Sequence, residues 1–374
     1  MPYKVPFVNY PEHYRRLWDE VMGVVTEVLS RGDLILRDQL RHFEENVAAF
    51  VGVKYAVGLN SGTDALYLSL LAANIGPGQE VITVAHTFVA TVSVIHYSGA
   101  TPILIDIGDD YNMHIDQIEK AISPRTKAIM PVHLNGRLCD MKKLMKIAKK
   151  HNLIVIEDAA QALGASFEGK KAGSFGLTGC FSFYPAKILG TAGDGGMMVT
   201  DSEDVAEKVR LLRDHGVQRT TGDILLYGFN SRLDNLHAAI LDAKLRHLPQ
   251  WIERRRELAN LYHKGLSNLP QIKLPVPPDS QNHYFDVFTN YVIRARDRDR
   301  LVAYLKENGV EVLISWPKPM HHHEALNLKH FNLPMTEQIS REVISLPLFP
   351  ELSNEQVEFV VDAIHKFYRT KRSI

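Results

Sequence analysis

Seven short apolar runs, separated by amphipathic or charged stretches, constrain the fold of this chain more than any other feature. Most are rich in β-branched residues or bounded by Gly, Pro or Asp, which is typical of strands buried on both faces. They lie at residues 54–59, 80–85, 101–106, 127–132, 152–158, 179–183 and 196–200. Helical patterns lie between them, for example at 141–151. This alternation predicts an α/β domain with a mainly parallel central sheet and a ligand site outside the carboxyl ends of its strands.

The length and the later part of the chain predict a second domain. The chain has 374 residues, and single hydrophobic cores stop growing near ~250–300 residues. A charged helical stretch at 236–265 leads away from the alternating pattern, and we expect Pro249 to bend or interrupt it. The pattern then predicts strands at 288–295 and 310–316 and helices at 298–309 and 353–369. We therefore divide the chain into a large domain with an N-terminal arm, residues 1–245, and a small α+β domain, residues 246–374.

Charge, cysteine content and hydropathy exclude several classes of function. The 43 Lys and Arg residues balance 43 Asp and Glu residues without a polybasic run, so no nucleic-acid or anionic-lipid partner is indicated. Cys139 and Cys180 are too few for a disulfide framework, which suits a reducing compartment. The first residues lack the apolar core of a signal peptide, and no run reaches the ~18 apolar residues of a membrane span. We expect a cytoplasmic protein that acts on a small polar substrate.

Two polar segments follow predicted strands and point to chemistry. In "NSGTDAL", residues 60–66, Gly62 and small neighbours open a helix whose backbone N–H groups can bind a phosphate, although Ser61, Thr63 or Asp64 can equally serve as a helix cap. In "IVIEDAAQALGA", Asp158 ends the most apolar strand, where a carboxylate needs a cation or hydrogen-bond donors. A helix N-cap is the alternative interpretation for Asp158.

The third segment, "FSFYPAKILGTAGDGG" at 181–196, places Lys187 between a strand and four glycines. A lone lysine in this position is most often a surface residue with a solvated amino group. Beside a phosphate turn and an acid at a strand end, however, a lysine can form a Schiff base with an aldehyde cofactor, while glycines let a flat ring approach the backbone. The three segments together match what pyridoxal phosphate (PLP) requires.

The chain resembles the DegT/DnrJ/EryC1/StrS family of PLP-dependent sugar aminotransferases. The resemblance covers nearly the whole chain, in the order "NSGTDAL", "EVITVAHTFVAT", "GATPILIDI", "TKAIMPVHLNG", "VIEDAAQALGA", "FSFYPAKILGTAGDGG", "RDHG", "GFNSRLDNLHAAIL" and "SLPLFPELSNEQ". It implies a fold-type-I PLP enzyme that forms a homodimer with shared active sites. It also implies transfer of an amino group from L-glutamate to a nucleotide-linked keto sugar, with pyridoxamine phosphate as the other cofactor form, in polysaccharide or deoxyamino-sugar biosynthesis.

The resemblance also assigns roles to individual residues. Lys187 matches the lysine that binds the cofactor covalently, Asp158 the acid that pairs with the ring nitrogen, and Gln161 a residue near the ring's phenolic oxygen. The other cofactor-binding positions are Gly62, Thr63 and Ser182 at the phosphate, Phe88 against the ring, and Asn230, which matches an asparagine that reaches the neighbouring subunit's phosphate. For Phe88 the alternative is a core residue at a helix start.

Substrate-side positions depart from the family pattern. Asn135 stands where the family often has tyrosine, and Ser315, Trp316 and Pro317 replace the common His-Tyr-Pro. "NSRLDNLHAAIL" resembles the branch that acts on 3-oxo rather than 4-oxo sugars. Our candidate substrate-binding residues are Tyr184, Arg232, Trp316 and His321.

The histidines at 321–323 raise the question of a metal site. Three adjacent histidines cannot all point one way on a regular element, and no acidic or cysteine ligand stands at zinc-like spacing. We therefore expect a solvated loop near the substrate and no metal.

Three other functions compete with the aminotransferase hypothesis. A PLP-dependent sugar dehydratase of this family has histidine where this chain has Lys187, and a Rossmann dehydrogenase needs a G-x-G-x-x-G that the chain lacks after its first strand. A non-catalytic regulatory relative could share the fold, but it would have no need of Lys187, Asp158, Gln161, Ser182 and Asn230.

Overall fold

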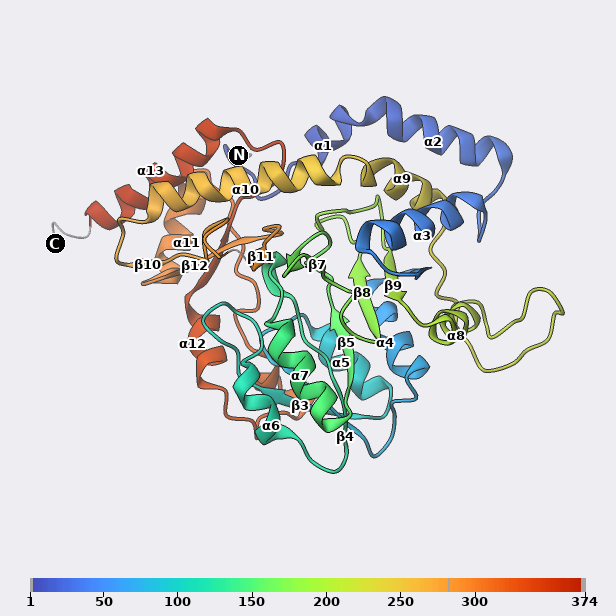
Figure 1. The fold of residues 1–374 in the computed structure, drawn as a ribbon. Helices are drawn as coiled ribbons and strands as arrows, with labels where there is room; N and C mark the ends of the chain where they lie inside the picture. Colours follow the sequence, from blue (N-terminus) through green and yellow to red (C-terminus); the bar gives the residue numbers. More distant parts are fainter. Residues whose placement is uncertain (1–2, 282, 371–374) are drawn as a thin grey trace.

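A seven-stranded, mostly parallel sheet forms the centre of the large domain in the computed structural model, which describes residues 3–281 and 283–370 (Figure 1). The strand order is β1-β9-β8-β5-β4-β2-β3, and β9 runs antiparallel to both of its neighbours. The strands are β1 (Tyr55–Leu59), β2 (Glu80–Val84), β3 (Thr101–Ile105), β4 (Thr126–Ile129), β5 (Ile154–Asp158), β8 (Thr178–Ser182) and β9 (Gly196–Thr200). The seven apolar runs are therefore the seven strands, and the predicted α/β fold class is confirmed.

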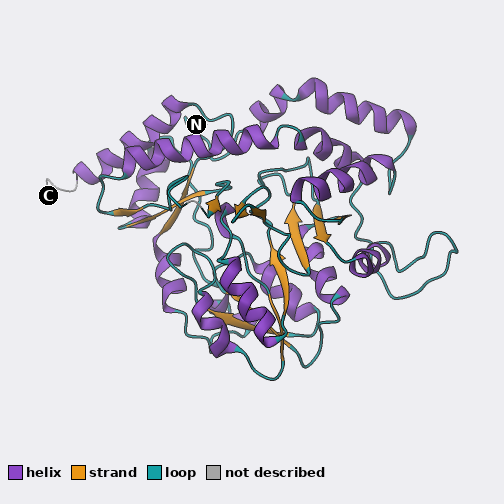
Figure 2. Cartoon of the chain, viewed as in Figure 1, coloured by secondary structure: helices purple, strands orange, loops and turns teal. Residues whose placement is uncertain are grey.

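Helices cover both faces of this sheet (Figure 2). Adjacent strand residues point to opposite faces: Val155 of β5 packs in the cluster that contains α3 (Asp38–Val51), α7 (Met141–His151) and α9 (Asn235–Leu245), whereas Ile156 packs in the cluster of α4 (Gly62–Ala72), α5 (Val89–Tyr97) and α8 (Glu203–Arg213). Burial on both faces explains why these strands are continuously apolar instead of alternating.

The predicted break at Pro249 separates two helices. α9 ends at Leu245, and α10 (Leu248–Leu266) begins with Pro249 in its first turn, where a missing N–H costs no helical hydrogen bond. Figure 1 shows α10 running from α9 toward the C-terminal elements.

The C-terminal elements build a second core around a small antiparallel sheet, β10-β12-β13. The strands of this sheet are β10 (Ile272–Lys273), β12 (Tyr291–Ala295) and β13 (Val343–Leu346), and the helices α11 (Arg298–Glu307) and α13 (Asn354–Thr370) also contribute to the core. Ser353 caps α13 as expected, because its Oγ accepts from the Gln356 amide at 3.2 Å. Val5 from the N-terminal arm also packs in this core. The division at residue 245 stays a prediction.

The predicted strand at 310–316 is wrong. Val310 forms an isolated bridge with Val5, and Leu313 forms another with Ser345, so the segment pairs with two different partners and never builds a ladder. Trp316 then takes a left-handed backbone conformation, with φ of 51°, which ends the extended course.

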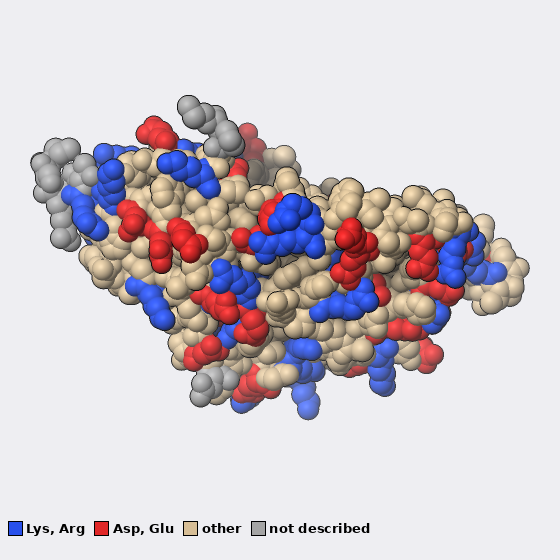
Figure 3. Space-filling model, turned by 90° about the horizontal axis from the view of Figure 1, so that it is seen from above, with Lys and Arg blue, Asp and Glu red and all other residues tan. Residues whose placement is uncertain are grey.

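The remaining elements connect and flank the two cores. They are α1 (Tyr10–Arg16), α2 (Trp18–Arg31), α6 (Ile118–Ala121), α12 (Pro334–Glu342), the short strands β6 (Ser166–Phe167), β7 (Lys170–Lys171) and β11 (Tyr284–Phe285), and the 3₁₀ turns η1 (Ile115–Gln117), η2 (Leu134–Gly136), η3 (Met320–His322) and η4 (Glu324–Leu326). Within the described residues, no helix is long and apolar enough to cross a membrane. On the face that Figure 3 shows, basic and acidic side chains are interspersed, as the balanced composition predicts.

Candidate active site

Three strand ends and one strand start meet at one edge of the large sheet. Leu59 at the end of β1 and Ser182 at the end of β8 both pair with Gly196, the first residue of β9. Asp158 at the end of β5 pairs with Cys180, two residues before Ser182. The fold therefore brings together the three polar segments that the sequence singled out, at the carboxyl ends of parallel strands where α/β proteins bind ligands.

At this edge the N-terminus of α4 packs closely against the end of β8, with Gly62 at the contact. Ser61 caps the helix, since its Oγ accepts from the Asp64 amide at 3.1 Å, and Ala65 donates the first backbone bond of the helix. Among the described residues the amides of Gly62 and Thr63 have no hydrogen-bond partner, as is usual for a first helical turn. A Cβ on Gly62 would lie 2.8 Å from Ser182 Cβ, so Gly62 is needed for this close approach. Such a turn suits an anion.

Asp158 is a buried carboxylate held from α5. It is 6% exposed, and its Oδ2 accepts from Thr91 Oγ1 at 2.7 Å, while Thr91 in turn meets Thr87 Oγ1 at 2.7 Å. Burial raises the pKa of Asp158, and the bonds from Thr91 and the Ala160 amide and the charge of Lys187 act in the opposite direction. Thr91 was missed by the sequence reasoning, although it lies in the quoted segment "EVITVAHTFVAT".

Lys187 is half-buried in the loop after β8, close enough to Asp158 for the two charges to interact. Burial lowers the pKa of Lys187, and the Asp158 carboxylate opposes that shift. A lysine with a lowered pKa is more often the neutral amine that can act as nucleophile or base. The fold thus places an amine and a buried carboxylate near each other at this edge.

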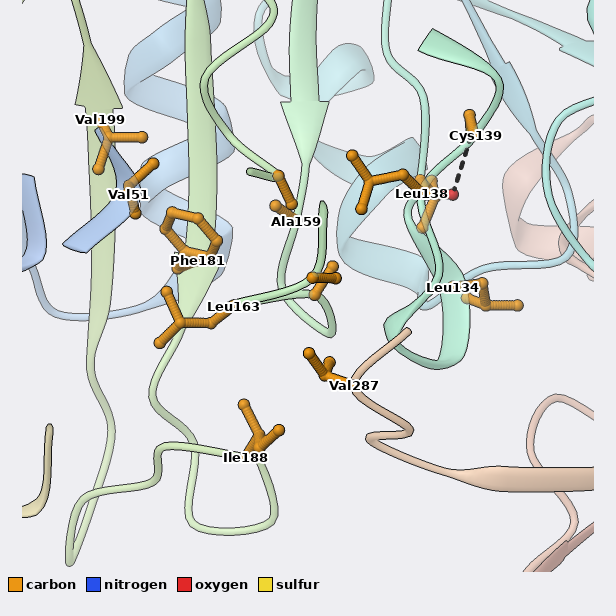
Figure 4. Packing of buried hydrophobic residues seen from close by; sticks show 14 of the residues in the cluster. Val51, Leu134, Leu138, Cys139, Ala159, Leu163, Phe181, Ile188, Val199 and Val287 are labelled. Carbon is orange, nitrogen blue, oxygen red and sulfur yellow. Dashed lines mark hydrogen bonds between the residues drawn. The ribbon is translucent and has the colours of Figure 1, made fainter. Parts of the chain in front are cut away.

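A second buried lysine holds the same loop. Lys244 of α9 donates to the carbonyl of Gly190, and burial lowers the pKa of Lys244 to about 8. Ile188 and Leu189, inside the loop, belong to the large buried cluster, part of which Figure 4 shows with Ile188, Leu163 and Val287 labelled. Nothing in the sequence pattern distinguished Lys244 from the other charges of its helical stretch.

Glu157, next to Asp158, serves the structure on the opposite face of the strand. Its side chain is fully buried and accepts hydrogen bonds from three backbone amides at 2.7–2.9 Å, those of Gly173, Phe175 and Gly176. It also forms a hydrogen bond with His133 Nε2 at 2.9 Å. The sequence placed both acids at the strand end. Strand alternation separates them, so that only Asp158 faces Thr91 and Lys187.

The other predicted cofactor residues surround this pair to different degrees. Gln161 Oε1 accepts from the Asn135 amide at 2.8 Å, which joins the turn after β5 to the segment after β4. Phe88 precedes α5, one turn before Thr91, and is 58% exposed, so its alternative interpretation as a core residue is wrong. Asn230 is exposed and forms a β-bridge with Asp214. The contact of Asn230 with another subunit stays a prediction.

The candidate substrate residues each have their own contacts in the structure. Tyr184 is exposed next to the lysine loop, and its carbonyl accepts from the Lys187 amide at 2.9 Å. Arg232 Nη1 is bound by Asp214 Oδ1 at 3.1 Å. The Trp316 ring packs edge-on against His86, 5.4 Å between centroids.

The expectation of a solvated loop is wrong for His321. This side chain is fully buried, and its Nε2 lies 3.3 Å from Glu337 Oε1, on α12. Glu337 is an acidic partner that spacing along the sequence did not reveal, because it lies 15 positions after His322 and only the fold brings them together.

Comparison with known proteins identifies the family to which the chain belongs. The sequence profile of the "DegT/DnrJ/EryC1/StrS aminotransferase family" matches residues 16–365. A Geobacillus stearothermophilus protein named "Pleiotropic regulatory protein" is 43% identical over 98% of this chain and 99% of its own length. The UDP-N-acetyl-3-dehydro-alpha-D-glucosamine 3-aminotransferase of Acidithiobacillus ferrooxidans is 43% identical over 97% of both chains.

A solved structure agrees with these sequence matches. The S. venezuelae protein DesV, crystallised "in complex with ketimine intermediate", superposes with a TM-score of 0.94 and 39% identity over 98% of this chain and 99% of that one. A match of this extent includes both cores and the edge that holds Lys187 and Asp158. The chain therefore belongs to the DegT/DnrJ/EryC1/StrS aminotransferase family.

Proposed function

We propose that this protein is a PLP-dependent aminotransferase that moves an amino group from L-glutamate to a nucleotide-linked 3-oxo sugar. The observation that carries the proposal is the position of Lys187 near the buried Asp158, beside the start of α4 where Gly62 packs against Ser182. Membership of an aminotransferase family and the name of the Acidithiobacillus relative, which specifies a 3-dehydro sugar, support it. The cytoplasmic location stays a prediction.

The donor set fits PLP at both of its ends. The amides of Gly62 and Thr63 and the hydroxyl of Ser182 suit a phosphate, and a Cβ on Gly62 would close that space. Asp158, held by Thr91, suits a protonated ring nitrogen, since a buried carboxylate needs a cation. When bound, PLP supplies an aldehyde for the amine and a ring that accepts electrons from the substrate carbon.

The chain's own residues would divide the remaining work. Lys187 Nζ would hold the cofactor covalently and, once released by glutamate, carry the proton between substrate carbon atoms and the cofactor. Asp158 would stabilise the positive charge on the protonated ring nitrogen of the cofactor. Gln161 and the exposed Phe88 would orient the ring. Tyr184 and Trp316 are our proposed contacts for the sugar.

The arginine and histidine candidates are weaker. Arg232 already pairs with Asp214, so it would have to exchange that partner for a diphosphate. His321 is buried against Glu337 and we no longer propose it as a sugar ligand.

A regulatory role is the second candidate function. The name of the Geobacillus relative favours it. The Lys187–Asp158 pair does not, because a regulator needs neither a lysine of lowered pKa nor a buried acid at a strand end. A protein that catalyses amino transfer could also regulate, so the test of the proposal is catalysis itself.

The half-reaction with glutamate tests the proposal without knowledge of the sugar. We expect L-glutamate, added to PLP-saturated protein, to remove the visible absorbance of the bound cofactor and to release one 2-oxoglutarate per occupied site. L-Aspartate is the matched control donor. Retention of the absorbance with glutamate would contradict the donor, and failure to bind PLP would favour the regulatory function. UDP- and dTDP-linked 3-oxo and 4-oxo sugars would then be compared as acceptors.

We also propose that the protein works as a homodimer. The loop at 214–234, which projects beyond α8 in Figure 1, carries apolar side chains without cover in one chain: Ile224 is 74% exposed and Tyr227 100%. Exposed apolar residues on one projecting segment are typical of a protein interface. Asn230 lies on this loop, as expected of a residue that reaches a neighbouring subunit.

Removing these apolar side chains should weaken the dimer. Burial of each is worth roughly 1.5–3 kcal/mol, so we expect the Ile224→Ser/Tyr227→Ser protein to dissociate at least ~100-fold more readily. Sedimentation velocity over a concentration series measures this change. Thr220→Ser, a conservative change on the same loop, is the control. Unchanged association of the double variant would place the interface elsewhere.

A further inference from the structure

The cluster of His321, His322 and Glu337 lies outside the proposed PLP site. His321 and His322 belong to η3, and Glu337 to α12. Both Nε2 atoms approach one carboxylate oxygen, Glu337 Oε1, at 3.3 Å and 3.2 Å, and the three ligand atoms lie within 4.8 Å of one another. Three potential metal ligands from two separate elements therefore converge at one point.

The two contacts are long hydrogen bonds, and their spacing also fits two ligands of one metal ion. Charge-assisted hydrogen bonds between a ring nitrogen and a carboxylate are about 2.7–2.9 Å long, which is shorter than the 3.2 Å and 3.3 Å found here. Zinc binds histidine and carboxylate atoms at about 2.0–2.1 Å in tetrahedral geometry, so neighbouring ligand atoms lie roughly 3.3 Å apart. The two measured separations are thus close to two edges of a zinc tetrahedron.

Both elements are fixed independently of any ion. The Met320 amide donates to Ala85 O at 3.1 Å, which holds η3 against the end of β2. Asp106 binds the amides of Met335 and Thr336 at 2.8 Å and 2.7 Å, which holds the start of α12. His321 is fully buried, whereas His322 and Glu337 are partly exposed. An ion could therefore enter from solvent and keep a water molecule as its fourth ligand.

We propose that His321, His322 and Glu337 bind one Zn²⁺ ion. Its place in the fold suggests a structural role: the ion would add a direct link between η3 and α12, which are otherwise held to different parts of the large domain. The segment at 316–322 touches the residues that precede Phe88, through Met320 to Ala85 and through Trp316 to His86. The proposal replaces our sequence-based expectation that this chain binds no metal.

Zinc binding to the intact, tag-free protein tests the proposal. Protein treated with a chelator would be equilibrated with micromolar ZnSO₄, and bound zinc measured by mass spectrometry of the metal after gel filtration. We expect one zinc per chain and a rise in the midpoint of thermal unfolding, because a ligand that binds only the folded state stabilises it. Mg²⁺ should give no such rise, since it prefers oxygen ligands.

Variants locate the site. Removing a residue that only orients a metal ligand costs up to ~100-fold in metal affinity. His322→Ala and Glu337→Gln each remove a ligand itself, so each should lower zinc affinity by at least ~100-fold. His323→Ala is the matched control, because His323 Nε2 lies 3.3 Å from the carbonyl of Lys318 and not in the cluster. Less than one zinc per two chains, or equal affinity in His322→Ala, Glu337→Gln and the unmodified protein, would overturn the proposal. Circular dichroism without zinc verifies that the variants are folded.

Discussion

The Lys187→Ala protein is expected to lose amino transfer by ~10³-fold or more, because the change removes both the covalent hold on PLP and the amine that carries the proton. The variant should still bind PLP through the turn of Gly62, Thr63 and Ser182, but without the visible absorbance of the covalent form. Turnover with glutamate and a keto sugar measures the first effect. Borohydride reduction followed by peptide mass spectrometry measures the second, and should place the cofactor on Lys187 in the unmodified protein.

A second half-buried lysine provides the control for this prediction. Lys171 donates to the carbonyl of Phe50, and burial lowers its pKa as well, but it lies on β7, which belongs to the separate sheet β11-β6-β7. Lys171→Ala should keep the absorbance and the activity. If borohydride reduction labelled another lysine, or if Lys187→Ala kept its activity, the assignment of Lys187 would be wrong.

The Asp158→Asn protein is expected to retain its fold and to lose about 10²–10³-fold in kcat, the usual cost of removing one preorganised electrostatic contact. Asparagine has the size of aspartate and can still accept from Thr91, but it brings no negative charge to the ring nitrogen. Burial raises the pKa of Asp158, and a positive charge on the ring nitrogen would act in the opposite direction and favour the carboxylate. Steady-state kinetics and the affinity for PLP measure the loss.

The Glu157→Gln protein is the control that distinguishes a loss of catalysis in Asp158→Asn from a loss of stability. Glu157→Gln changes the neighbouring carboxylate, which binds three backbone amides and His133 on the other face of β5. We expect that variant to unfold at lower urea concentration while kcat stays within about threefold, since its side chain does not face the cofactor. Equal loss of kcat in both variants would show that Asp158 acts only through folding.

The sequence determined the strands and the three polar segments that the fold brings to one edge of the sheet. Burial on both faces requires continuous apolar runs. A polar residue at the end of such a strand is costly to bury unless a ligand or another residue binds it. Asp158, Lys187 and the turn at Gly62 could therefore be proposed as a site without a structure. The strand predicted at 310–316 failed because pairing depends on partners, here Val5 and Ser345, that local pattern does not reveal.

Only the tertiary structure decided which side chains meet. Strand alternation turns Glu157 away from Asp158, α5 brings Thr91 to the carboxylate, and α9 brings Lys244 to the loop of Lys187. The burial of His321 and its approach to Glu337 depend on how η3 packs on α12. Hydrophobic periodicity fixes each element because it is a local property, whereas contacts between residues far apart in the chain follow from how the elements pack, which no local pattern contains.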